Sequence, residues 1–182
     1  MIVLCLGLLL LTGCTTYTKA PTPNLDGVLE ALGYSLAPDY LPEGFEFVKF
    51  ELTEYDKPTA LLAYSSHLAG SHHLFVSYPV PFNPEGNPFG WQRPDDAISI
   101  VTVNGEATYL IRGTWSEDTT SNPPLDPSDA EWDYDSYLTL YFDFDLSQDE
   151  RIGVMIRALV FSSEWITTSE MVKIAESLRQ VD

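Results

Sequence analysis

The protein has 182 residues, of which 27 are acidic and 9 are basic, and its formal net charge at pH 7 is −18. This balance excludes a nucleic-acid-binding protein, because no patch of Lys and Arg is present to neutralise phosphates. It also disfavours electrostatic docking on anionic lipid, which needs clustered basic residues. Aromatic residues make up 13% of the chain, which excludes a disordered protein. A body of about 150 residues can bury a full core without cross-links, and the length fits one domain.

The chain begins with an apolar run over residues 2–11, followed by Leu11-Thr12-Gly13-Cys14. The run is too short to span a bilayer, which takes about 20 apolar residues, and it fits the apolar core of a signal peptide. The alternative is a buried N-terminal helix, but the small residues at the end of the run suit cleavage better than packing. Signal peptides normally begin with positive charge. None precedes this run, so we expect the natural start to lie upstream of Met1.

The segment Leu11-Thr12-Gly13-Cys14 resembles the lipobox of bacterial lipoproteins. The resemblance implies removal of residues 1–13, acylation of Cys14 with diacylglycerol, and a protein held on the extracytoplasmic face of a membrane. Each buried methylene of an acyl chain contributes about 0.8 kcal/mol, and two chains anchor stably where one binds only marginally. Cys5 lies in the removed segment, so the mature chain keeps no free thiol. A disulfide, a thiolate metal site and a cysteine nucleophile are then excluded.

Residues 14–23 have the small, polar, proline-bearing composition of a flexible tether. Residues 24–37 are expected to form a short helix and a linker. Asn24 is the expected N-cap and Gly33 the expected C-terminal cap. The apolar stripe repeats at helical spacing, through Leu25, Val28, Leu29 and Leu32.

The domain proper is predicted over residues 38–182, and it begins with strands. A strand over residues 45–53 changes the phase of its alternation, which indicates a bulge. Residues 59–65 and 73–78 are predicted to form a hairpin. Asn104-Gly105 is the strongest short-range signal for a second hairpin, between residues 98–103 and 107–112. The alternating runs 137–144 and 152–160 form the third predicted pair of strands.

The chain closes with a predicted helix that Thr167 and Glu170 begin as a capping-box pair. Its apolar stripe runs through Met171, Ile174, Ala175 and Leu178. The predicted fold is therefore α+β: a curved antiparallel β-sheet of about seven strands, with the C-terminal helix packed on one face and a short N-terminal helix.

Several short motifs follow one another in a recognisable order: Tyr40-Leu41-Pro42-Glu43-Gly44-Phe45, Val103-Asn104-Gly105-Glu106-Ala107, a late strand pair, and the helix that starts at Thr168-Ser169-Glu170. This order resembles the DUF4367 type of bacterial extracytoplasmic domain, which is found in lipoproteins and behind membrane-anchored anti-sigma segments. The resemblance covers roughly residues 40–180. It implies the same α+β fold and a relation to half-barrel proteins that handle lipoproteins and sense envelope stress. The acidic insertion over residues 116–136 departs from the usual short connection.

Metal and cofactor sites are not expected. His67, His72 and His73 flank one hairpin loop, but structural zinc takes four ligands at defined spacing. The acidic insertion supplies oxygen ligands without the calcium-loop pattern and its central glycine. Solvated side chains are the expected state in both places, with weak calcium binding as the alternative for the insertion.

Enzyme motifs are also missing from the sequence. There is no G-x-S-x-G elbow, no H-E-x-x-H and no phosphate-cradling glycine loop. Carboxylate pairs for glycoside hydrolysis stay open, because an acidic chain always contains some. Since function must be argued from a site and none is visible, we expect a protein without catalytic activity.

Two functions remain. The first is a non-catalytic binding or sensor domain for a lipid or peptide, with a ligand groove formed by Phe82, Phe89 and Trp91 of a proline-rich loop and by Tyr137 and Tyr141 on a sheet face. The alternative to such a groove is that the loop and the N-terminal helix cover this face. The second function is a structural or interaction lipoprotein that docks on another envelope protein through its acidic insertion.

The lipobox assignment predicts that Cys14→Ser leaves the precursor without lipid and releases it from the membrane fraction. The thioether to diacylglycerol needs the cysteine sulfur, and a serine hydroxyl does not replace it. Fractionation combined with metabolic fatty-acid labelling measures both effects. Labelling that persists in the Cys14→Ser variant contradicts the assignment.

Overall fold

The computed structural model describes residues 20–54, 57–66, 72–81, 94–115, 131–159 and 166–181. The predicted signal peptide, the lipidation site Cys14 and most of the tether lie outside these residues. So do the loop aromatics Phe82, Phe89 and Trp91 and most of the predicted acidic insertion. In the ranges that are described, no helix has the length and apolar character needed to cross a membrane.

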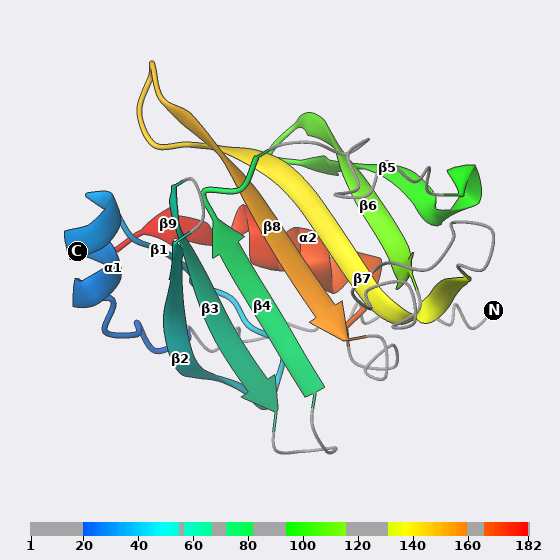
Figure 1. Cartoon of the computed structure of the whole chain (residues 1–182), viewed down its shortest axis with the longest axis horizontal. Helices are drawn as coiled ribbons and strands as arrows, with labels where there is room; N and C mark the ends of the chain where they lie inside the picture. Colours follow the sequence, from blue (N-terminus) through cyan, green and yellow to red (C-terminus); the bar gives the residue numbers. More distant parts are fainter. Residues whose placement is uncertain are drawn as a thin grey trace, which may run out of the picture.

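The main sheet has seven strands, each antiparallel to its neighbours, in the order β2-β3-β4-β8-β7-β6-β5 (Figure 1). The strands are β2 (Phe45–Glu54), β3 (Pro58–Ser66), β4 (His72–Tyr78), β5 (Ile98–Val103), β6 (Glu106–Trp115), β7 (Trp132–Asp145) and β8 (Arg151–Leu159). The predicted α+β class and the three predicted hairpins are confirmed. Because β8 inserts beside β4, the β5–β6 hairpin is placed at the far edge of the sheet.

Two strands carry irregularities. The register of β2 against β3 shifts between Phe47 and Lys49, which confirms the predicted bulge. The register of β6 against β7 shifts between Arg112 and Thr114, around Gly113 at φ +98°. The indole nitrogen of Trp132 donates to the carbonyl of Arg112 at 3.0 Å and holds this second bulge in place. Residues 132–136, predicted as part of the insertion, are therefore the start of β7.

Helix α1 (Asp26–Leu32) ends at Gly33 in the left-handed conformation, as the sequence predicts. Its beginning differs from the prediction, because the N-cap residue is Leu25 and makes no side-chain cap. The side-chain amide oxygen of Asn24 instead accepts from the backbone N–H of Asp26, the first residue of the helix, at 3.0 Å. The side chain still satisfies a backbone donor, in a local turn.

Helix α2 (Thr168–Glu176) begins at the Thr167 cap, whose hydroxyl accepts from the backbone N–H of Glu170. The second half of the predicted capping box is absent. The Glu170 carboxylate accepts instead from the hydroxyl of Tyr40 and pairs with Lys173 at 2.8 Å. Lys173 also lies 5.7 Å from the centre of the Tyr40 ring. A partner distant in the chain therefore outcompetes the local capping bond.

The C-terminal end of α2 corrects the predicted helical stripe. The helix stops at Glu176, and Leu178 lies in β9 (Leu178–Gln180), which pairs antiparallel with β1 (Leu36–Pro38). This second, two-stranded sheet was not predicted. Leu178 is nonetheless buried, but it packs into the core from a strand and not from the last turn of the helix.

The core fills the space between α2, α1 and one face of the main sheet, and Figure 1 shows α2 crossing behind the strands. The fully buried side chains of this core include Val28, Leu62, Val76, Leu140, Val154, Ile156, Met171 and Ile174. The strand residues among them occupy alternate positions and therefore share the face that α2 covers. The opposite face carries the other half of each alternating pattern.

The two sheets are joined by the phenol of Tyr78, at the end of β4. Its hydroxyl donates to the carbonyl of Leu36 at 3.0 Å and accepts from the backbone N–H of Leu36 at 2.9 Å. Both residues are fully buried. Burial raises the pKa of Tyr78 to about 12, against a smaller opposite effect of the bond to Leu36. The phenol is thus held neutral where it satisfies both backbone groups of one residue in β1.

Tyr78→Phe should lower the free energy of unfolding by about 1 to 3 kcal/mol, because it leaves the buried N–H and C=O of Leu36 without this partner. A pH dependence accompanies the loss. The folded protein keeps the Tyr78 proton between the ordinary pKa of 10.0 and about 12, while the unfolded chain releases it. Stability therefore falls as the pH rises through this range, by at most about 1.4 kcal/mol per pH unit for this tyrosine. Urea unfolding between pH 8 and pH 11.5 measures both effects. If the free energy of unfolding falls equally steeply with pH in the wild type and in Tyr78→Phe, Tyr78 does not cause the pH dependence.

The packing of α2 on the sheet predicts that Ile174→Ala costs about 2 to 5 kcal/mol, since the side chain is fully buried. Glu176→Ala is the matched control on the exposed side of the same helix, and its effect should stay within about 0.5 kcal/mol. A pair of urea melts on the two variants provides the comparison. Coincident midpoints would mean that α2 is not docked on the sheet as described.

Candidate functional site

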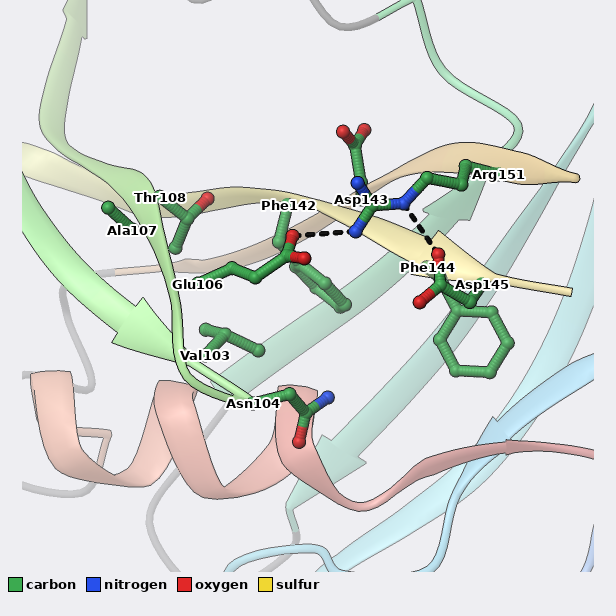
Figure 2. A pocket seen from close by; sticks show the side chains of 10 residues that line it. All are labelled: Val103, Asn104, Glu106, Ala107, Thr108, Phe142, Asp143, Phe144, Asp145 and Arg151. Atoms are coloured by element: carbon green, nitrogen blue, oxygen red, sulfur yellow. Dashed lines mark hydrogen bonds and ion pairs between the residues drawn. The ribbon is translucent and has the colours of Figure 1, made fainter. Parts of the chain in front are cut away.

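A cleft opens where β6 and β7 part. The two strands pair from Arg112 opposite Leu138 to Tyr109 opposite Tyr141, and the ladder ends there. At this point the hydroxyl of Thr108 donates to the carbonyl of Tyr141, so a side chain takes the place of the next ladder bond. Beyond it lies a cavity of about 240 Å³. Its walls are Val103, Asn104, Glu106, Ala107 and Thr108 on one side and Phe142, Asp143, Phe144 and Asp145 on the other, with Arg151 (Figure 2).

Arg151 crosses this cleft from β8. Its Nη2 lies 2.6 Å from a carboxylate oxygen of Glu106, and its Nε lies 2.5 Å from Oδ1 of Asp145 (Figure 2). These two hydrogen bonds raise the pKa of the guanidinium, the one to Glu106 most. A single cation thereby connects the tip of the β5–β6 hairpin to the β7–β8 hairpin.

The charged side chains of this cleft link three strands, β6, β7 and β8. Both carboxylates that face Arg151 are held by it, and all three side chains remain 45 to 64% exposed. Exposed ion pairs contribute little to stability individually. The guanidinium lies between the two carboxylates and pairs with both across the cleft. We therefore assign the cleft a structural role.

A second, larger cavity of about 380 Å³ lies against the start of α2. Its lining combines five leucine, isoleucine and alanine residues with three hydroxyl-bearing residues and one arginine: Ser99, Leu110, Arg112, Leu138, Ala158, Leu159, Ile166, Thr167 and Thr168. This combination of an apolar wall with a few polar groups is typical of small-molecule sites, whose volumes begin at about 300 Å³.

Arg112 supplies the charge of the larger cavity. Its Nε donates to the carbonyl of Tyr134 at 3.3 Å, and its Nη2 lies 3.7 Å from Asp135, at the outer limit of an ion pair. The side chain is 59% exposed and Asp135 is 88% exposed. Water screens a pair of this kind strongly, so the guanidinium keeps hydrogen-bonding capacity for an anionic group.

The predicted groove residues are only partly placed. Tyr137 and Tyr141 lie on β7, half-buried, on the sheet face opposite α2. Tyr141 stands in register with Tyr109 on β6 and Met155 on β8. Neither tyrosine lines the two cavities described above. The other predicted members, Phe82, Phe89 and Trp91, lie outside the described residues.

Sequence reasoning missed Arg157, which lies beside Tyr137 on the same face. Its guanidinium carbon is 5.2 Å from the centre of the Tyr137 ring, and its Nη2 is 3.9 Å from the sulfur of Met155. The Nε is buried, and among the residues that the structure describes it has no hydrogen-bond partner. A cation facing an aromatic ring is stabilised by the ring quadrupole. The signal in the sequence was an arginine at an alternate position inside an otherwise apolar strand.

Of the three loop histidines, His73 is the one whose side chain the structure describes. His73 stacks on Phe75 within β4, with ring centres 6.1 Å apart, and His67 lies outside the described residues. Across the described ranges, no group of three or more His, Cys, Asp or Glu side chains is placed to hold a metal ion.

No family model, curated protein or solved structure matches the chain. The lipobox and the resemblance to DUF4367 domains therefore stay predictions from the residues that carry them. The function rests on the geometry described above.

Proposed function

We propose that the protein is a membrane-anchored extracytoplasmic lipoprotein whose DUF4367-like domain binds a small ligand without catalysing a reaction. The lipobox at Cys14 supports the anchor. The net charge of −18 supports a soluble body that stands away from anionic lipid, while the lipid holds its N-terminus. The alternative, docking through residues 116–136, stays a prediction from composition.

The observation that carries the binding function is the cavity of about 380 Å³ at the start of α2. Its walls come from the main sheet and from the Ile166–Thr168 segment, so two layers of the fold hold the site. Buried neighbours such as Leu110, Ala158 and Ile166 keep these walls in place. A preformed apolar pocket favours binding, because the protein does not lose further conformational entropy on ordering it.

The lining points to the class of ligand. An apolar body suits the leucine and isoleucine walls, and an acidic head group suits Arg112 at the exposed side. A carboxylate that carries an aliphatic chain combines both features. The site presents hydroxyls and one guanidinium and pairs no nucleophile with a base, which supports binding without turnover.

The proposal predicts that residues 15–182 bind dodecanoate, measured by isothermal titration calorimetry, and that Arg112→Gln lowers the affinity about tenfold or more. The loss follows because a hydrogen bond to a charged group contributes about 1.5 to 3 kcal/mol. Native mass spectrometry of the same protein reports whether a lipid is retained from the cell.

Lys57→Gln serves as the matched control, since it removes the same charge at an exposed position far along the chain from the cavity. Its affinity for dodecanoate should equal that of the wild type. Binding that is absent in the wild type, or reduced equally by both substitutions, contradicts the proposed site.

A further inference from the structure

The two edges of the main sheet are built differently. β2 forms one edge, and its bulge between Phe47 and Lys49 interrupts the pairing register. Charged residues recur along it at Glu46, Lys49 and Glu51, and the last two form an ion pair. Bulges and edge charges are the features by which sheets prevent another strand from adding.

β5 forms the other edge and has neither feature. Its sequence, ISIVTV, contains no charge and no proline, and its register against β6 is regular over all six residues. Ile100 is 73% exposed, the highest value among the large apolar side chains that the structure describes. A regular, uncharged edge with an exposed isoleucine is a template for a further strand.

The backbone of β5 is available on its outer side. Val103 and Glu106 flank the two-residue turn and form a hydrogen-bonded pair, so alternate residues back along the strand also bond to β6. Ile100 and Thr102 fall at the intervening positions, and their N–H and C=O groups point away from β6. In the described part of the chain no partner is found for these groups.

The face opposite α2 continues the edge as a row of side chains. Ile100 stands in register with Tyr109, Tyr109 with Tyr141, and Tyr141 with Met155. All four lie on neighbouring strands and on one face. An apolar side chain on an added strand, opposite Ile100, would extend this row by one position and cover the exposed isoleucine.

Charge at the start of the strand selects among partners. Asp95 and Asp96 precede β5 and are both exposed, and Asp96 accepts from the Tyr134 hydroxyl at 2.7 Å. In an antiparallel pair, the C-terminal end of the added strand lies beside these carboxylates. A second copy of this chain would bring a net charge of −18 close to the two aspartates that precede β5, and repulsion disfavours it.

We propose that β5 is a docking edge for an extended segment of another protein, which adds as an antiparallel strand. The segment carries an apolar side chain opposite Ile100 and basic residues at its C-terminal end, facing Asp95. Main-chain hydrogen bonds from Ile100 and Thr102 provide the affinity, and the isoleucine and the aspartates provide the orientation. The docking edge uses the outward backbone groups of Ile100 and Thr102, whereas the cavity at α2 is lined by Ser99 of the same strand, so the two sites share β5 but no residue.

The test uses the full chain in a non-ionic detergent and an eight-residue peptide of alternating threonine and valine that ends in two lysines. We expect saturable binding by fluorescence anisotropy below about 1 mM peptide. A peptide with the two lysines moved to its N-terminal end should bind more weakly. Ile100→Pro removes one outward N–H and leaves the bonds to β6, and it should weaken binding at least about fivefold.

A second pair of variants keeps the test valid if proline disturbs the fold. Ile100→Lys should weaken binding, whereas Val48→Lys, which adds the same charge to an exposed position on the β2 edge, should not. Absence of binding at about 1 mM overturns the proposal, as does an equal effect of the two lysine variants. Self-association in analytical ultracentrifugation that Ile100→Lys abolishes also overturns it, because the occupant is then a second copy.

Discussion

The arrangement of the whole domain depends on two hydrogen bonds from one side chain. The Tyr78 phenol satisfies both backbone groups of Leu36 and so attaches the small β1–β9 sheet to the large one. Since β9 follows α2 directly, this attachment also determines where the C-terminal end of α2 lies. Tyr40 and Glu170 hold the other end of the helix. The helix is thus held at both ends by hydrogen bonds and along its length by its buried apolar stripe.

The position of α2 in turn creates the candidate ligand site. Thr167 and Thr168 form one wall of the cavity, and strands β5 to β8 form the rest. A small shift of the helix start would close the space or open it to solvent. The cleft bridged by Arg151 lies at the other end of the same strands, and there the ion pairs draw the strands together. Each end of these strands therefore keeps a cavity, one bridged by ion pairs and the other lined by the start of α2.

The sequence predicted those parts of the fold that depend on neighbouring residues. Asn104-Gly105 identified its hairpin, the phase change identified the β2 bulge, and Thr167 identified the start of α2, because each signal acts within a few residues. The β1–β9 sheet escaped prediction, since three-residue strands separated by most of the chain leave no local pattern. The cavity depends on the packing of distant elements, which residue order alone does not encode. The sequence predicted that Arg157 lies in a strand. Its contact with the Tyr137 ring depends on how two strands pair, and the sequence alone did not predict this contact.

The pairing of β1 with β9 brings the first and the last described strands together, with Leu36 opposite Gln180 and the Ser35 hydroxyl donating to the carbonyl of Val181 at 2.7 Å. During synthesis, the partner of β1 therefore leaves the ribosome after every other strand that the structure describes. The three hairpins can form earlier, because their strands are close in sequence. The carbonyl of Ser35, which accepts from the backbone N–H of Val181 at 3.0 Å, must wait for this partner until translation of the domain is nearly complete. Until β9 has emerged, β1 has no strand to pair with, and such an unpaired strand is prone to aggregation.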